Sequence, residues 1–323
     1  MIKVEWFYWL IALFFLAVGF MVLRDRSNPN RIWSGVFWSL LGLCFSYSSF
    51  VVAKTAPGWP LGLAIVAIAG IAGFGKLSRG TQERTTSPAE RETLSARFGN
   101  KLFLPVLVVP VVTGVFAVLG PKISIGGRPV LEPLSETVIG LGASAIIAVG
   151  VGMWLLRTPH PAVVLHEGRR LTETIGWAAI LPQLLAMLGL VFATAGVGKA
   201  IGTTVQNILP QGSLIAAVAL YCLGMAVFTA ITGNAFAAFP VMTAAIGYPL
   251  LVEQYHGTAA AVFAIGMLSG YCGTLLTPMA ANFNIVPVAL LGLKSDWAVI
   301  RAQMPTAVPL LAANIGLMYY LAF

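Results

Sequence analysis

Long stretches without any charged residue are the feature that most limits how this chain can fold. The longest runs from Ala200 to Val252 and contains no Asp, Glu, Lys or Arg. Over the whole sequence 58% of residues are hydrophobic and 9% are charged, against about 25% charged in soluble domains. Apolar runs of about 20 residues predict membrane-spanning helices, and the sequence lacks the short alternating segments of a transmembrane barrel. We therefore predict an all-α polytopic membrane protein.

Basic residues indicate the orientation of the predicted spans. Three arginines within residues 24–31 follow the first apolar run, whereas Lys3 and Glu5 are the charged residues that precede it. Because Lys and Arg concentrate in cytoplasmic loops, we predict an outside N-terminus, a cytoplasmic loop over residues 76–101 and eight to nine membrane segments. This count leaves the C-terminus outside. Topology explains the net charge of +8, so no nucleic-acid partner is predicted.

A polar stretch interrupts one predicted membrane segment, residues 258–293. That segment exceeds the about 20 residues that one span needs. Pro278 lacks a backbone N–H and disfavours helical geometry at Thr277, so the sequence itself breaks the helix. Inside a membrane, such breaks persist where the freed backbone lines a cavity or meets a ligand. We predict a discontinuous helix that forms half of a solute-binding site, with a simple proline kink as the alternative.

A second polar joint, Thr232-Gly233-Asn234, lies between two apolar arms. Every other predicted cytoplasmic loop contains Lys or Arg, and this one contains neither. Gly and Asn suit a tight turn or a left-handed backbone position. The sequence therefore predicts a re-entrant hairpin over residues 212–255, and two full spans with a very short loop are the alternative.

Neither joint contains a charged side chain, yet both offer groups that bind small anions. The N-terminus of a half-helix presents unpaired amides and a partial positive charge, and Asn and Thr add neutral donors. Freed carbonyls could also bind sodium, so a coupling ion, Na⁺ or H⁺, is left open, and no cofactor is predicted. The candidate binding residues are Thr232, Gly233, Asn234, Gly273, Thr274, Thr277, Pro278, Asn282 and Asn284.

An intramembrane enzyme is the weaker reading of the segment 157–170. His166-Glu167 resembles the start of a zinc-protease motif, but Arg170 stands where the second histidine would be. We predict a loop here, with a helix beginning near Leu171–Glu173, and neither a metal site nor catalytic residues. The three cysteines lie in apolar stretches and are predicted to be reduced thiols; they are Cys44, Cys222 and Cys272.

Two long motifs carry a resemblance to a known family: Gly233–Met242, GNAFAAFPVM, and Gly273–Pro287, GTLLTPMAANFNIVP. They resemble a bacterial membrane family formerly of unknown function, whose members are described as subunits of a 5-oxoproline (pyroglutamate) transporter. The likeness covers essentially the whole chain, including 167–170 and 176–182. More distantly, the hairpin and broken helix are similar to the ion-transporter superfamily of dicarboxylate and citrate carriers, in which two inverted repeats bind sodium and carboxylate.

The resemblance implies a secondary transporter subunit in the bacterial inner membrane, acting on a small carboxylate. We expect one membrane domain over 1–323, with scaffold spans in 1–156, a further span near 175–197 and a transport half over 171–323. Residues 6–156 contain no matching Asn-rich break, so a second, shorter membrane subunit is expected to supply the other half of the site. A membrane scaffold that transports nothing is the main alternative.

Overall fold

The computed structural model describes residues 1–81, 87–157, 160, 162–208 and 213–323. Parts of the predicted 76–101 and 157–170 loops (82–86, 158–159 and 161), and residue 212 at the predicted start of the hairpin, lie outside the described residues. The chain folds as two compact units, Met1–Gly176 and Trp177–Phe323. Residues 171–176, which we expected to open the transport half, thus belong to the first unit.

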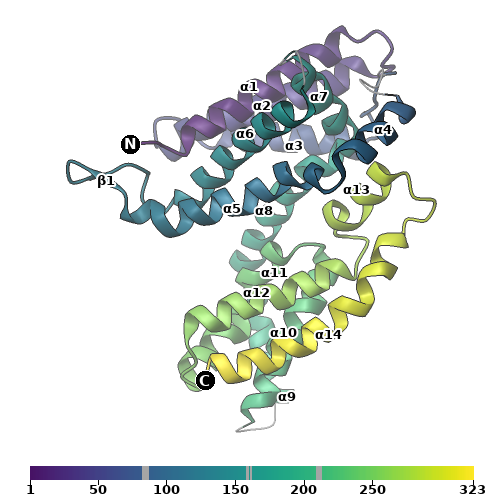
Figure 1. Ribbon diagram of the computed structural model, residues 1–323. Helices are drawn as coiled ribbons and strands as arrows, with labels where there is room; N and C mark the ends of the chain where they lie inside the picture. Colours follow the sequence, from purple (N-terminus) through teal and green to yellow (C-terminus); the bar gives the residue numbers. More distant parts are fainter. Residues whose placement is uncertain (82–86, 158–159, 161, 209–212) are drawn as a thin grey trace. The chain divides into compact units, whose positions relative to one another are not determined.

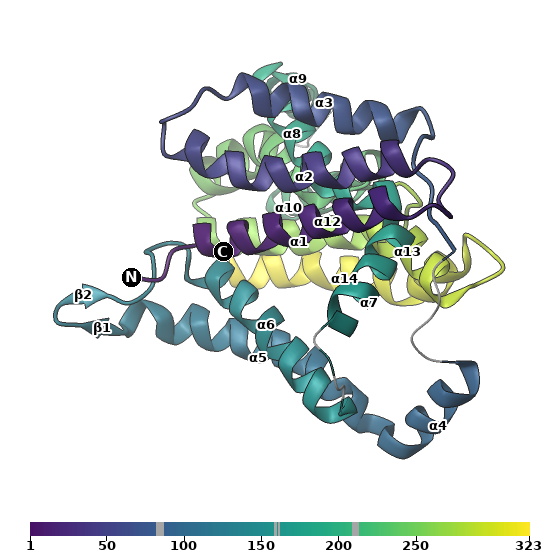
Figure 2. The same cartoon turned by 90° about the horizontal axis from the view of Figure 1, so that it is seen from above.

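The described part of the first unit consists of helices and one small β-hairpin between α5 and α6 (Figure 1). Figure 2 shows α1, α2 and α3 lying side by side, with α2 in the middle. Gly42 brings the backbones of α1 and α2 together, since a Cβ atom there would lie 2.8 Å from the Ala12 carbonyl oxygen. The elements are α1 (Glu5–Arg24), α2 (Arg31–Val52), α3 (Trp59–Gly73), α4 (Pro88–Phe98), a 3₁₀ turn (Gly99–Phe103), α5 (Leu104–Leu119), a second 3₁₀ turn (Gly120–Lys122), β1 (Ser124–Ile125), β2 (Arg128–Pro129), α6 (Glu136–Leu156) and α7 (Ala162–Ile175).

The second unit packs its helices around a buried tyrosine. The Tyr221 side chain is fully buried and its hydroxyl lies 3.3 Å from Thr243 Oγ1. Its ring fills the space left by two glycines, Gly247 and Gly266. The elements are a 3₁₀ turn (Gly176–Ile180, which crosses the boundary), α8 (Leu181–Thr194), α9 (Val197–Ile208), α10 (Leu214–Thr232), α11 (Ala235–Met242), a π-helix (Thr243–Gln254), α12 (Ala259–Leu275), α13 (Ala281–Leu291) and α14 (Ala298–Leu321).

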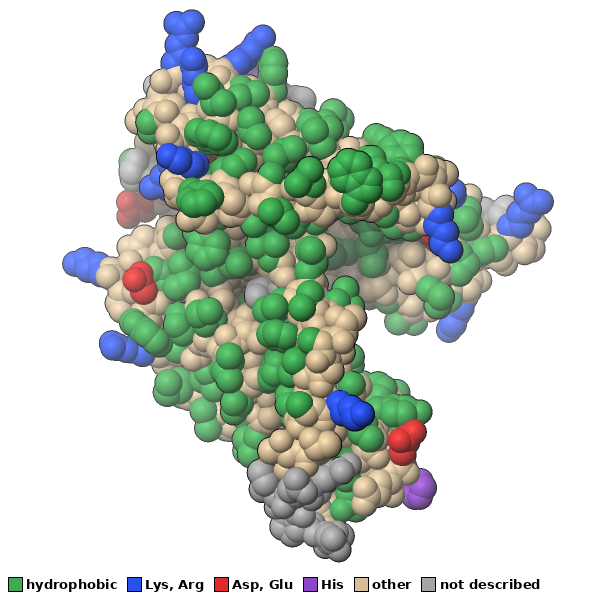
Figure 3. Space-filling model, turned by 180° about the vertical axis from the view of Figure 1, so that it is seen from behind, with side chains coloured by type: hydrophobic (Ala, Val, Ile, Leu, Met, Phe, Trp, Pro, Cys, Tyr) green, Lys and Arg blue, Asp and Glu red, His purple; other side chains and the backbone are tan. Residues whose placement is uncertain are grey.

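The prediction of a predominantly helical, polytopic membrane protein is confirmed by the number of long apolar helices. Among the described residues, seven helical segments are long and apolar enough to cross a membrane, and one bent pair raises this to eight. Figure 3 shows hydrophobic side chains over much of the visible surface, with few charged ones among them. The seven are Glu5–Arg24, Arg31–Val52, Ala89–Lys122, Glu136–Leu156, Leu214–Thr232, Ala235–Gln254 and Ala298–Leu321.

The α-helix in the predicted span near 175–197 is shorter than expected, because α8 starts at Leu181, after the 3₁₀ turn, and ends at Thr194. At the predicted end of the span the chain bends by 64° into α9, which starts at Val197. Gly196 makes the turn possible, since it has a φ of +74°, which favours glycine.

Two predicted loops also contain helices. The segment 76–101 includes α4, whose start is fixed by a capping box: the Ser87 amide donates to Glu90 Oε2, and the Glu90 amide donates to Ser87 Oγ. The segment 157–170 was wrongly predicted as a loop, because α7 begins at Ala162 rather than near Leu171. An ion pair from α7 to the end of α1 holds that helix in place.

Candidate functional site

The hairpin joint is a tight turn between α10 and α11. Gly233 ends α10 in the left-handed conformation, with φ +78°, and its N–H donates to the Thr229 carbonyl at 2.7 Å. Asn234 is extended, and its Oδ1 accepts from the Phe236 amide at 2.7 Å, which caps α11. The Thr232 hydroxyl donates back to the Phe228 carbonyl at 3.0 Å. Gly233 therefore ends α10, and Asn234 directly after it begins α11.

The interruption predicted within 258–293 is present, as residues 276–280 between α12 and α13. One side chain holds it: Asn284 Nδ2 donates to the Thr274 carbonyl at 2.8 Å and to the Thr277 carbonyl at 2.6 Å. Thr277 Oγ1 accepts from the Met279 amide at 3.2 Å. The Thr274 hydroxyl is used within its own helix, donating to the Tyr271 carbonyl at 2.6 Å. Asn284 thus replaces part of the hydrogen bonding that the broken helix gives up.

The two joints lie against each other. A Cβ atom on Gly233 would collide with the carbonyl oxygen of Met279, in the middle of the break. A turn before the break, Gly273 touches the backbone of α10, because a Cβ there would collide with the Ala226 carbonyl. Close backbone contact of this kind needs glycine. The structure therefore brings the two predicted joints together within one unit.

Burial separates the candidate residues into two groups. Asn284 and Thr274 are at most 1% exposed, and Thr277 and Asn234 are 5% and 7% exposed. Gly233 and Gly273 are also buried, whereas Thr232, Pro278 and Asn282 are half-buried. The half-buried groups are the ones that a ligand arriving from the surface of the unit meets first.

Two polar atoms near the joints are buried without a hydrogen-bond partner among the described residues: Asn284 Oδ1 and Thr229 Oγ1. Both hydrogens of the Asn284 amide face carbonyls, which fixes the orientation of that amide and leaves Oδ1 as an acceptor. In addition, α13 begins at Ala281 without a side-chain cap. The break therefore offers an unused acceptor and a helix N-terminus with partial positive charge.

Aromatic side chains surround the joints. The Tyr271 ring contacts Phe236 at 6.3 Å and Phe283 at 6.5 Å between ring centroids. Phe236, Phe283 and Met279 are 54%, 42% and 60% exposed. In a membrane protein, exposed apolar groups of this kind contact either lipid or a partner protein.

A charge cluster in the first unit was not found from the sequence. Arg169 of α7 pairs with Asp25, after α1, at 2.5 Å and with Glu173 at 3.0 Å. Asp25 and Glu173 lie far apart in the sequence, and the pattern of 157–170 gave no signal for this contact. The sequence does contain a signal for the other pair, because Arg169 and Glu173 are four residues apart and lie on one face of a helix.

The two carboxyl groups of this cluster have shifted pKa values. Burial raises the pKa of Glu173 above its usual 4.5, in spite of the attraction of Arg169 and Arg79. Burial also acts to raise the pKa of Asp25, but hydrogen bonds from Ser27 and Arg169 outweigh it and leave that pKa below 3.8. Glu173 Oε1 is buried and has no hydrogen-bond partner among the described residues.

This arrangement predicts a stability that depends on pH. Between pH 4.5 and the raised pKa of Glu173, the folded protein binds a proton that the unfolded chain releases, so stability falls as pH rises through that window. Asp25 acts in the opposite direction but below pH 3.8, outside the window. Thermal unfolding in detergent should show this slope in the wild type and lose it in Glu173→Gln. An equal slope in both proteins would contradict the assignment.

Among the described residues, no group of three or more His, Cys, Asp or Glu side chains is placed to hold an ion. His166 and Glu167 lie on α7, and Glu167 pairs with Arg170 at 2.7 Å. Cys222 and Cys272 are buried and Cys44 is half-buried, all three as free thiols.

Comparison with known proteins gives one match. A family model described as "Protein of unknown function (DUF979)" matches residues 5–323. No curated protein and no solved structure matches the chain. Because the family match covers almost the whole sequence, the chain belongs to the DUF979 family.

Proposed function

We propose that this protein is a membrane subunit of a secondary transporter for a small carboxylate. The observation that carries the proposal is the contact between Gly233 and Met279, which joins two uncharged helix breaks in an apolar unit. A helix break in hydrocarbon leaves backbone groups without partners, and a polar ligand can supply them. By its resemblance, 5-oxoproline is the first substrate to test, and Na⁺ and H⁺ are the coupling ions to test.

The binding chemistry fits a small anion better than a neutral solute. The uncapped start of α13 offers amide donors and partial positive charge to a carboxylate. Asn282, half-buried on the first turn of α13, adds a neutral donor, and Asn234 adds another across the contact. No Lys or Arg has to be desolvated, so the site can release its ligand as well as bind it.

A second subunit forms part of the same proposal. Phe236, Met279 and Phe283 surround the joints and are each more than 40% exposed. In the first unit, α1, α2 and α6 run without a break, so they offer no second joint of this kind. We propose that a shorter membrane protein covers these three exposed side chains and completes the site. The proposed topology has both termini outside the inner membrane. The arms Leu214–Thr232 (α10) and Ala235–Gln254 (α11 with the π-helix) form either a re-entrant hairpin or two spans, since each arm is long enough to cross.

Uptake of labelled 5-oxoproline by cells tests the function. We expect uptake when this chain is present with its partner subunit, and uptake near background when Asn234→Ala and Asn282→Ala are combined. Asn100→Ala, at an exposed position in the 3₁₀ turn Gly99–Phe103 of the first unit, is the matched control and should leave uptake unchanged. Unchanged uptake in the double variant would exclude the proposed site. Absence of uptake for any small carboxylate, with both subunits folded in the membrane, would favour the scaffold alternative.

A further inference from the structure

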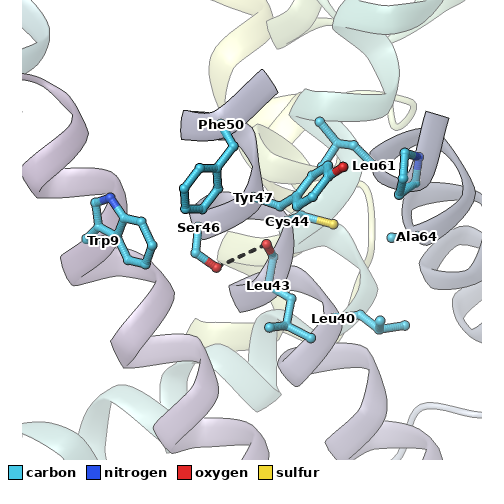
Figure 4. A pocket seen from close by; sticks show the side chains of 10 residues that line it. Trp9, Leu40, Leu43, Cys44, Ser46, Tyr47, Phe50, Leu61 and Ala64 are labelled. Carbon is cyan, nitrogen blue, oxygen red and sulfur yellow. Dashed lines mark hydrogen bonds between the residues drawn. The ribbon is translucent and has the colours of Figure 1, made fainter. Parts of the chain in front are cut away.

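The first unit contains an apolar cavity that the proposed transport site does not use. It has a volume of about 340 Å³ and lies over α2, between α1 and α3. Figure 4 shows Trp9 at one side, Leu61 and Ala64 at the other, and side chains of α2 between them. Trp9 packs edge-on against Phe50, with 5.9 Å between ring centroids, so the two rings form one wall.

The polar groups in the lining are largely occupied. The Ser46 hydroxyl donates to the Leu43 carbonyl at 3.1 Å, and the Tyr47 hydroxyl donates to the Pro57 carbonyl at 3.0 Å. No charged residue lines the cavity. A carboxylate or another polar solute would lose its hydration here without gaining partners. The occupant must therefore be apolar where it enters the cavity.

A single positive charge lies close to this cavity along the chain. Between Arg31 and Lys76, Lys54 is the only charged residue, and it is exposed in the turn after α2. Phe50, which lines the cavity, accepts hydrogen bonds in the same turn, from the Thr55 and Ala56 amides. Since α2 is apolar and long enough to span, its end lies at the membrane interface, where the Lys54 ammonium can pair with a lipid phosphate. In the proposed topology this is the outer interface.

We propose that the cavity over α2 binds one anionic phospholipid of the surrounding bilayer. An acyl chain occupies the cavity between Trp9 and Ala64, and the phosphate lies at Lys54. This site is independent of the proposed transport site and of the substrate. It differs from the apolar face of α5, a helix without a single buried residue, on which lipid makes only surface contact.

A photoactivatable phosphatidylglycerol with a diazirine in its acyl chain tests the proposal. The full-length protein is reconstituted in vesicles, illuminated and digested, and the adducts are mapped by mass spectrometry. Adducts should concentrate on peptides of α1, α2 and α3 that line the cavity, above the level on α5. Ala64→Phe fills the cavity and should reduce them severalfold. Val66→Phe, on the exposed side of α3, is the matched control and should not.

The headgroup is tested separately. Lys54→Gln should lower the preference for phosphatidylglycerol over phosphatidylcholine about fivefold, the effect of roughly one lysine near a membrane surface. Lys76→Gln, beyond the other end of α3, should leave the preference unchanged. Equal labelling of the cavity and α5, or equal labelling of Ala64→Phe and the wild type in protein with unchanged thermal unfolding, would overturn the proposal. A cross-linked dimer through this face would show that a second copy covers it instead.

Discussion

Gly233→Ala is expected to destabilise the protein by about 2–4 kcal/mol and to abolish transport. Two effects add. An alanine at φ +78° pays about 1–2 kcal/mol for the left-handed conformation. Its methyl group would also occupy the place of the Met279 carbonyl, so the hairpin joint and the helix break must move apart. The measurement is reversible unfolding in mixed micelles, together with uptake in cells.

Comparison with Gly292→Ala separates the collision with Met279 from the cost of the left-handed backbone. Gly292 also ends a helix of the second unit in the left-handed conformation, with φ +64°, but nothing lies within 4 Å of a Cβ there. Its alanine variant should lose only the conformational part, about 1–2 kcal/mol, and should retain uptake. If the two variants lose the same stability and both transport, the contact between the joints has no role in the function.

The architecture could be read from the sequence to a useful depth. Charge-free runs predict helices in a membrane, and Pro278 with its neighbouring Thr and Asn residues predicts the break that the structure has at residues 276–280. Gly233 and Asn234 predict the tight joint, since one suits a helix end and the other a helix start. These are local effects, and local effects can be read from a sequence.

Other features depend on contacts that no local pattern states. Gly196 lies at the 64° bend between α8 and α9, and no local pattern gives that angle. The pairing of Arg169 with Asp25 joins residues that are 144 positions apart. The prediction for Asn284 was incomplete for the same reason. The sequence marks it as a polar residue near a break, and the structure adds that its amide holds the break together.

Asn284→Ala is expected to destabilise the second unit by about 2–4 kcal/mol, because two buried carbonyls lose their donor at once. Those carbonyls belong to Thr274 and Thr277, on the two sides of the point where α12 ends. Asn284→Asp should be worse, since an ionised carboxylate would face both carbonyl oxygens and donate to neither. Uptake should be lost in both variants, because the break can no longer keep its shape. Unfolding in mixed micelles measures the stability.

Asn282→Ala separates a structural role from a binding role on the same helix. Asn282 is half-buried, two residues before Asn284, and its replacement should change stability by less than about 0.5 kcal/mol. We therefore expect Asn282→Ala to lose uptake at unchanged stability, and Asn284→Ala to lose both uptake and stability. A stable Asn284→Ala protein would show that other groups hold the break. The buried Oδ1 of Asn284 sharpens the distinction: it has no partner among the described residues, so a ligand that donates to it should stabilise the wild type against unfolding and leave Asn284→Ala unaffected.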